Sequence, residues 1–119
     1  MPSHILSVSY DAALLKTREL ILQAHGYRVI SALGFEHALQ ACKDAGQSVH
    51  LFILGHSIPA GDKKALVEQF RERCNAPVIA LTRVTESRIA GADYYIDPDP
   101  TPLVALVTSI LKPESQSSS

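Results

Sequence analysis

A histidine and a serine stand next to each other at His56 and Ser57, in the segment GHSIPAG that follows the most apolar run of the chain. A nucleophile with a nearby base is the arrangement that acyl-transfer chemistry uses. That chemistry also needs a third group to orient the base and a pocket for the oxyanion, and adjacent side chains at the end of a strand diverge. The sequence supplies no partner for the pair, so a hydrolytic role is not expected.

Two cysteines are the other reactive side chains. Cys42 and Cys74 are too few for a secreted disulfide framework, and each falls on the apolar stripe of a predicted helix. A buried cysteine behaves as a small hydrophobe, which is the favoured interpretation. Because the two helices are expected to lie side by side, a redox pair remains the alternative. The other histidines share no i, i+4 face and predict no zinc site: His4, His25, His37 and His50.

Phosphate-binding glycine patterns are weak in this sequence. No G-x-G-x-x-G follows the first predicted strand and no Walker pattern occurs, so Gly55 and Gly61 match a nucleotide or flavin cradle poorly. We therefore predict neither a cofactor nor a metal ion.

Composition narrows the classes of partner. The 119 residues are 46% apolar and 19% charged, which suffices for one globular domain with a hydrophobic core. The 11 basic and 12 acidic side chains leave a net charge of −1, so nucleic-acid binding is not expected. No apolar run approaches the length of a membrane span, and the first residues lack a secretory signal. A cytoplasmic protein without membrane contact is predicted.

The hydrophobic period alternates between short continuous runs and helical spacing, which is typical of successive βα units. Strands are predicted over residues 4–9, 27–32, 49–54, 78–82 and 92–96. Helices are predicted over residues 12–25, 34–45, 62–74 and 102–111, with a shortened fourth helix within 83–90. The elements form one domain over residues 1–112, and the polar residues 113–119 are expected to be a disordered tail.

Local signals mark where the helices begin and end. Asp11 is expected to cap the first helix, and Gly26 to end it in the left-handed conformation. Asp62 is expected to cap the third helix. The apolar stripe of that helix leaves Lys63 on the side predicted to face water.

Strands that alternate with helices imply a doubly wound α/β fold, a parallel sheet with helices on both faces. In such sheets, ligands bind in the crevice at the carboxyl ends of the strands. The residues predicted to meet there are Ser9, Tyr10, Asp11, Gly55, His56, Ser57, Thr82, Arg83, Asp97 and Pro98.

The order of several landmarks resembles the receiver domain of bacterial two-component response regulators. ILSVSYD stands where that family has an apolar strand ending in an acidic pair, GYRVISA matches its second strand, and VHLFILGHSIP matches the stretch around its phosphorylated aspartate. PVIALT, GAD and a final X-Pro dipeptide complete the set. The resemblance spans nearly the whole chain and implies a CheY-like, flavodoxin-like sheet in the order 2-1-3-4-5.

The resemblance also implies which residues occupy the family's phosphorylation pocket. The phosphoacceptor stands four residues before a proline, so counting back from Pro59 places it on Gly55. The acidic pair that holds the divalent cation falls on Ser9 and Tyr10, which leaves no carboxylate at either position.

Other pocket positions are partly retained. The family's hydroxyl is matched by Thr82, and its lysine before the final proline is matched by Asp97, or by Pro98 in an ungapped count. Neither alignment places a lysine at this position. Asp11 remains near the pocket, but its position favours a helix cap over a metal ligand.

Phosphorylation of an aspartate requires a cation that neutralises charge on the phosphoryl oxygens, and magnesium binds through carboxylate oxygens. The sequence therefore predicts a degenerate pseudo-receiver, not an enzyme, that acts in signal transduction through protein–protein contacts, with a homodimer left open. Candidate contact residues are His56, Tyr94 and Tyr95. The alternative is a small-ligand sensor that uses the neutral hydrogen-bonding groups of the same crevice.

Overall fold

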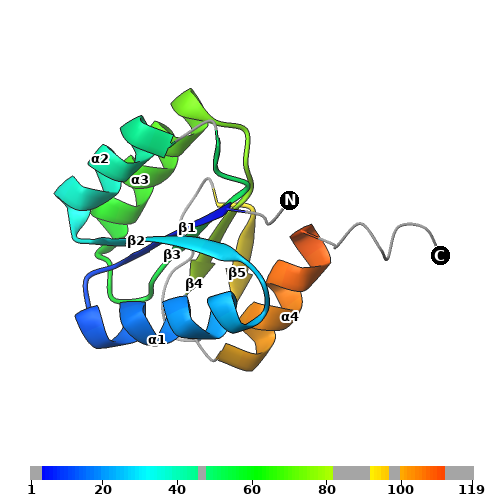
Figure 1. The fold of residues 1–119 in the computed structure, drawn as a ribbon. Coiled ribbons are helices and arrows are strands. Elements are labelled where there is room, and N and C mark those ends of the chain that lie inside the picture. The colour runs from blue at the N-terminus through cyan, green and yellow to red at the C-terminus, as the bar shows by residue number, and fades with distance from the viewer. Residues whose placement is uncertain (1–3, 46–47, 82–91, 97–99, 112–119) are drawn as a thin grey trace.

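The computed structural model describes residues 4–45, 48–81, 92–96 and 100–111 (Figure 1). Within these residues, five parallel strands form one sheet in the order β2-β1-β3-β4-β5. The strands are β1 (His4–Ser9), β2 (Arg28–Leu33), β3 (Leu51–Leu54), β4 (Val78–Leu81) and β5 (Tyr94–Ile96). The helices are α1 (Ala12–Ala24), α2 (Phe35–Ala45), α3 (Ala60–Arg73) and α4 (Pro100–Leu111). The predicted fold class and strand order are confirmed.

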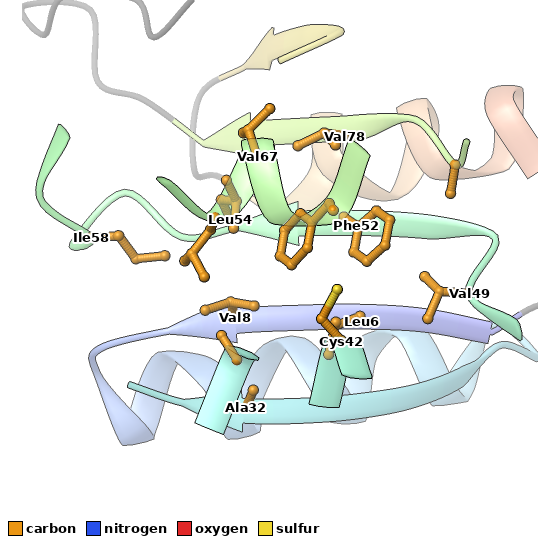
Figure 2. Close-up of a cluster of buried hydrophobic side chains, with 14 residues drawn as sticks. Leu6, Val8, Ala32, Cys42, Val49, Phe52, Leu54, Ile58, Val67 and Val78 are labelled. Carbon is orange, nitrogen blue, oxygen red and sulfur yellow. The ribbon is translucent and has the colours of Figure 1, made fainter. Parts of the chain in front are cut away.

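Two hydrophobic layers hold the sheet between the helices. As Figure 1 shows, α2 and α3 cover one face of the sheet, while α1 and α4 cover the other. The central strands β3 and β4 are buried along their whole length because helices lie on both faces. On the α2/α3 face, the rings of Phe52 and Phe70 stack with their centroids 4.0 Å apart, in the cluster drawn in Figure 2.

The caps of the first helix follow from elementary hydrogen bonding. The carboxylate of Asp11 accepts from the backbone N–H groups of Ala13 and Leu14, which have no partner within the helix. Gly26 has a φ of 93°, the left-handed conformation that glycine adopts without a steric penalty. Both predictions are confirmed.

The third helix begins earlier than its acidic residue indicated. Helix α3 begins at Ala60, and its N-cap residue is Pro59, which offers no side-chain cap. Asp62 therefore lies inside the first turn, and the prediction that it caps the helix is wrong. The proline has the fixed φ that is compatible with a helix start, so the chain enters the helix directly after it.

Two cations occupy buried helix positions. Lys63 is 2% exposed and Arg18 is 6% exposed. The prediction that Lys63 faces water is wrong, because it lies on the same stripe as the buried residues Leu66 and Phe70, three and seven positions further on. Burial lowers the pKa of the Arg18 guanidinium by disfavouring its charged form.

Smaller differences from the prediction concern element ends. The second strand begins at Arg28, the third at Leu51 and the fifth at Tyr94, while the last helix begins at Pro100. Several predicted features lie outside the described residues, namely Thr82, the helix within 83–90, the turn at Asp97 and Pro98, and the tail. Among the described helices, none has the length and apolar character to cross a membrane.

Candidate functional site: the carboxyl edge of the sheet

Gly55 lies at the centre of the crevice, directly after β3. It is buried, and its N–H donates to the carbonyl oxygen of Val8 at 2.8 Å, so it extends the pairing between β1 and β3. A Cβ added at this position would lie 3.2 Å from that carbonyl oxygen and 3.3 Å from the hydroxyl oxygen of Ser9. Glycine at this position therefore allows β1 and β3 to approach closely. Its φ is not in the left-handed region.

The hydroxyl of Ser9 is committed to the turn between β1 and α1. Ser9 is fully buried, and its Oγ accepts from the backbone N–H of Asp11 at 3.1 Å and donates to the Asp11 carbonyl at 3.2 Å. A hydroxyl has one proton to donate, and this contact uses it. Ser9 thus stabilises the turn that precedes the cap of α1.

Tyr10 bridges the mouth of the crevice. Its hydroxyl donates to Oδ2 of Asp62 at 2.8 Å, which joins the loop after β1 to the first turn of α3. Burial, together with the hydrogen bond and the negative charge of Asp62, raises the pKa of Tyr10 well above its usual range. The phenol therefore stays protonated and keeps its role as the donor. We call this contact the Tyr10–Asp62 bridge.

The residue after Asp62 in α3, Lys63, reaches the same edge of the sheet. The Nζ of Lys63 donates to the carbonyl oxygen of Leu81, the last residue of β4, at 3.1 Å. The contact is buried, and hydrogen bonds that involve a charged group are stronger than neutral ones. Positive charge is thus present at this edge, but it comes from α3 and not from the segment after β5.

The carboxylates that the structure describes near the crevice, Asp11 and Asp62, do not form a metal site. Asp11 uses one oxygen to cap α1, and Asp62 accepts from Tyr10. Among the described residues, no group of three or more His, Cys, Asp or Glu side chains is arranged to hold a metal ion. Ser9 and Tyr10 add no carboxylate, so the magnesium ion that the receiver resemblance implies does not fit these residues.

The structure places the predicted contact residues in two separate regions. His56 and Ser57 lie in the turn after Gly55, where Ser57 is exposed and His56 is half-buried. Tyr94 and Tyr95 lie on the edge strand β5, and Tyr94 is 39% exposed. Because neighbours on a strand point to opposite faces, the two tyrosines belong to different surfaces.

Sequence reasoning missed three contacts: the Tyr10–Asp62 bridge, the bond from Lys63 to Leu81 and the stack of His4 on His50. Asp62 and Lys63 both make hydrogen bonds at the crevice. The burial of Lys63 could have been predicted, because its spacing places it on the apolar stripe of α3. At the opposite edge of the sheet, the rings of His4 and His50 stack with centroids 5.9 Å apart. The pairing of β1 with β3 brings these two histidines together, which helix periodicity alone could not show.

Comparison with known proteins agrees with this architecture. The receiver domain of the hybrid histidine kinase CckA matches with a TM-score of 0.77 and 25% identity over 92% of this chain and 100% of that domain. A putative response regulator from Chloroflexus aurantiacus J-10-fl matches with a TM-score of 0.74 and 27% identity over 95% of this chain and 100% of its own. The fold is therefore that of CheY-like receiver domains.

Sequence relatives agree with the structural ones. The chain is 29% identical over 123 residues to a probable transcriptional regulator ycf27 of Porphyridium aerugineum, a match that covers 97% of this chain and 50% of the relative. It is 30% identical over 116 residues to the protein of the same description from Pyropia yezoensis, covering 91% and 47%. The chain thus spans about half the length of these relatives. No model of a known protein family matches the chain.

Proposed function

We propose that this chain is a receiver-like signalling domain that cannot be phosphorylated and that acts through contacts with another protein. The observation that carries the proposal is Gly55. It occupies the phosphoacceptor position implied by the receiver resemblance, and it has no side chain that could attack a phosphoryl group.

The surroundings of Gly55 support the same conclusion. A phosphoryl group needs a cation to balance its charge during transfer, and that cation needs carboxylate oxygens. Here the two equivalent positions carry the hydroxyls of Ser9 and Tyr10, and both hydroxyls donate to other groups of the protein. These two hydroxyls are therefore engaged within the protein, and neither replaces a carboxylate that would hold the cation.

The proposed contact surface centres on the β5 edge. Strand β5 pairs with β4 on one side and ends the described sheet on the other. Next to it, Asp93 accepts from the backbone N–H of Val78 at 2.7 Å and forms an ion pair with Arg71 at 3.0 Å, which anchors the start of the strand. An exposed tyrosine on a fixed strand is a common anchor in protein interfaces, since it combines apolar area with a hydroxyl. We assign this role to Tyr94.

The ligand-sensor alternative receives less support. It relied on five neutral hydrogen-bonding residues of the crevice, namely Ser9, Tyr10, His56, Ser57 and Thr82. The donors of two of them, Ser9 and Tyr10, are engaged within the protein. A thermal-shift screen against nucleotides and flavins tests it, because a ligand at about 100 times its dissociation constant stabilises the fold by roughly 2.7 kcal/mol.

The test of the main proposal is incubation with acetyl phosphate and magnesium, followed by intact mass measurement. The wild-type protein is expected to keep its unmodified mass. The variant Gly55→Asp alone is expected to stay unmodified as well, because it still lacks the carboxylates that hold the cation. A phosphorylated wild-type protein would reject the proposal.

A second experiment addresses the contact surface. A photoreactive amino acid placed at Tyr94 is expected to crosslink a protein partner in the native host, whereas the same group at Leu20 is not. Leu20 is the matched control because it is 54% exposed and lies on α1, away from β5. Equal crosslinking at both positions would contradict the assignment, and a crosslink to a second copy of the chain would identify the partner as a homodimer.

A further inference from the structure

The two cysteines lie at the amino edge of the sheet, whereas the crevice lies at the carboxyl edge. Cys42 is in the last turn of α2, and Cys74 is the residue that ends α3. Cys74 has an extended backbone, with a φ of −158°, so it lies outside the helical stripe on which its sequence spacing placed it. It is half-buried, whereas Cys42 is 1% exposed.

Hydrogen bonds place both cysteines at the same end of α3. The thiol of Cys42 lies 3.9 Å from the carbonyl oxygen of Gln69, in the last turn of α3. The backbone N–H of Cys74 donates to the next carbonyl, that of Phe70, at 2.8 Å. Cys42 therefore contacts the helical turn that Cys74 closes.

The second thiol faces the same hydrophobic cluster. The Sγ of Cys74 donates to the carbonyl oxygen of Val49 at 3.3 Å, and Cys74 packs against the cluster that contains both Val49 and Cys42. Figure 2 shows the side chain of Cys42 directed into this cluster. The pKa of Cys42 is raised mainly by burial, lowered by Arg73 and raised further by Cys74. Both cysteines therefore contact the same hydrophobic cluster at the shared end of α2 and α3.

A charged pocket of about 430 Å³ opens beside Cys42, and its lining reaches Arg73, the residue before Cys74. It is lined by Cys42 together with two basic and two acidic side chains, Lys43, Arg73, Asp44 and Glu72. Glu72 and Arg73 directly precede Cys74 in the chain. A small molecule that carries both ammonium and carboxylate groups is complementary to such a lining.

We propose that Cys42 and Cys74 form a redox-active pair that closes to a disulfide by exchange with a small zwitterionic disulfide bound at this pocket. The thiolate of Cys74, the more exposed of the two, attacks the small disulfide and releases one small thiol. The thiolate of Cys42 then attacks the sulfur of Cys74 in the mixed disulfide and releases the second small thiol. The protein loses two thiol hydrogens and is oxidised, and the small disulfide is reduced to two thiols.

The bridge would join the end of α2 to the end of α3. The disulfide would restrict the movement of α2 relative to α3, the two helices that cover one face of the sheet. It would not involve the crevice or the β5 edge. This inference is independent of the proposed function, since it does not depend on whether the domain can be phosphorylated.

The test uses oxidised glutathione as the small disulfide and the intact folded chain. We expect the wild-type mass to fall by two hydrogens without a lasting glutathione adduct, and a non-reduced digest to contain a peptide that joins Cys42 to Cys74. Cys42→Ser is expected to accumulate the adduct on Cys74, because the resolving thiol is gone. Cys74→Ser is expected to remain unmodified, because Cys42 is buried.

A measurement on the wild-type protein alone guards against variants that fail to fold. In a series of glutathione redox buffers, the native chain should favour the disulfide over the dithiol on the order of tenfold more than the same chain in urea, because folding holds the thiols together. A wild-type protein that keeps a stable glutathione adduct, or a native preference no greater than that in urea, would overturn the proposal.

Discussion

The two ends of the sheet use their polar side chains in opposite ways. At the carboxyl edge, three polar side chains of the crevice hydrogen-bond within the protein: Ser9 to the turn after β1, Tyr10 to Asp62, and Lys63 to the last carbonyl of β4. At the amino edge, two thiols make weak hydrogen bonds to carbonyl oxygens beside an open charged pocket.

The two edges of the sheet therefore differ in the role that we propose for their polar side chains. The carboxyl edge is where the receiver resemblance places phosphoryl transfer, and under the proposed function its groups serve only to hold this edge together. The amino edge carries the thiol pair that we propose to be redox-active. A fold therefore does not by itself state where its chemistry lies.

The largest expected effect is at Lys63. Lys63→Ala should lower the free energy of unfolding by about 2–4 kcal/mol, because it leaves a cavity and removes a buried charged hydrogen bond to Leu81. Lys63→Met should recover part of this loss by restoring the volume. Urea denaturation measures both, and Lys64→Ala is the control, since Lys64 is exposed and should change stability by less than about 0.5 kcal/mol. Equal effects at positions 63 and 64 would show that the lysine is not part of the carboxyl edge.

Substitution of two glycines by alanine is expected to change the free energy of unfolding in opposite directions. Gly55→Ala should destabilise the fold by about 1–2 kcal/mol, because the new Cβ crowds a backbone carbonyl and the Ser9 hydroxyl. Gly61→Ala should stabilise it by about 0.5–1 kcal/mol, because it lies within α3 with open space around the added carbon. Thermal unfolding of the two variants gives the comparison directly. A stabilising Gly55→Ala would mean that the strands do not approach closely at the crevice.

The Tyr10–Asp62 bridge predicts a pH dependence at the alkaline end. The pKa of Tyr10 is raised in the folded protein, so the unfolded chain releases the phenolic proton first as the pH rises. The contribution of the bridge is therefore complete below about pH 10, the ordinary value for tyrosine, and is lost above it. The urea midpoint of the wild-type protein should fall more steeply between about pH 9 and pH 11 than that of Tyr10→Phe. Identical slopes would show that the phenol is not held protonated.

The smallest expected effect lies at the amino edge. His50→Ala removes a hydrogen bond between the backbone N–H of His4 and Nδ1 of His50, and this contact is exposed. The free energy of unfolding should change by less than about 0.5 kcal/mol at neutral pH. A loss similar to that of Lys63→Ala would mean that the two edges do not differ as described.

The sequence predicted the architecture because its strongest signals are local. Short apolar runs, the cap at Asp11 and the left-handed Gly26 each determine structure through neighbouring residues. The order of strands followed from the family resemblance. The position of Gly55 at the end of β3 followed from counting back from Pro59, and the structure places this glycine beside Ser9.

The remaining contacts of the site depend on residues that are distant in the chain. The bridge between Tyr10 and Asp62 spans 52 positions, and no local pattern predicts it. Lys63 is a different case, because its spacing already placed it on the buried stripe of α3. Its charge led to the opposite prediction, since lysine is rarely buried without a partner. The carbonyl of Leu81 that it binds becomes apparent only in three dimensions.

The most direct measurement of the central claim is a comparison of amide spectra by NMR, with and without magnesium and beryllofluoride, a mimic of the phosphoryl group. The account predicts that the amides of Ser9, Tyr10 and Gly55 keep their positions when both are added, because these three residues supply neither the nucleophilic carboxylate nor the carboxylates that hold the cation. Saturable shifts centred on those three residues would contradict it.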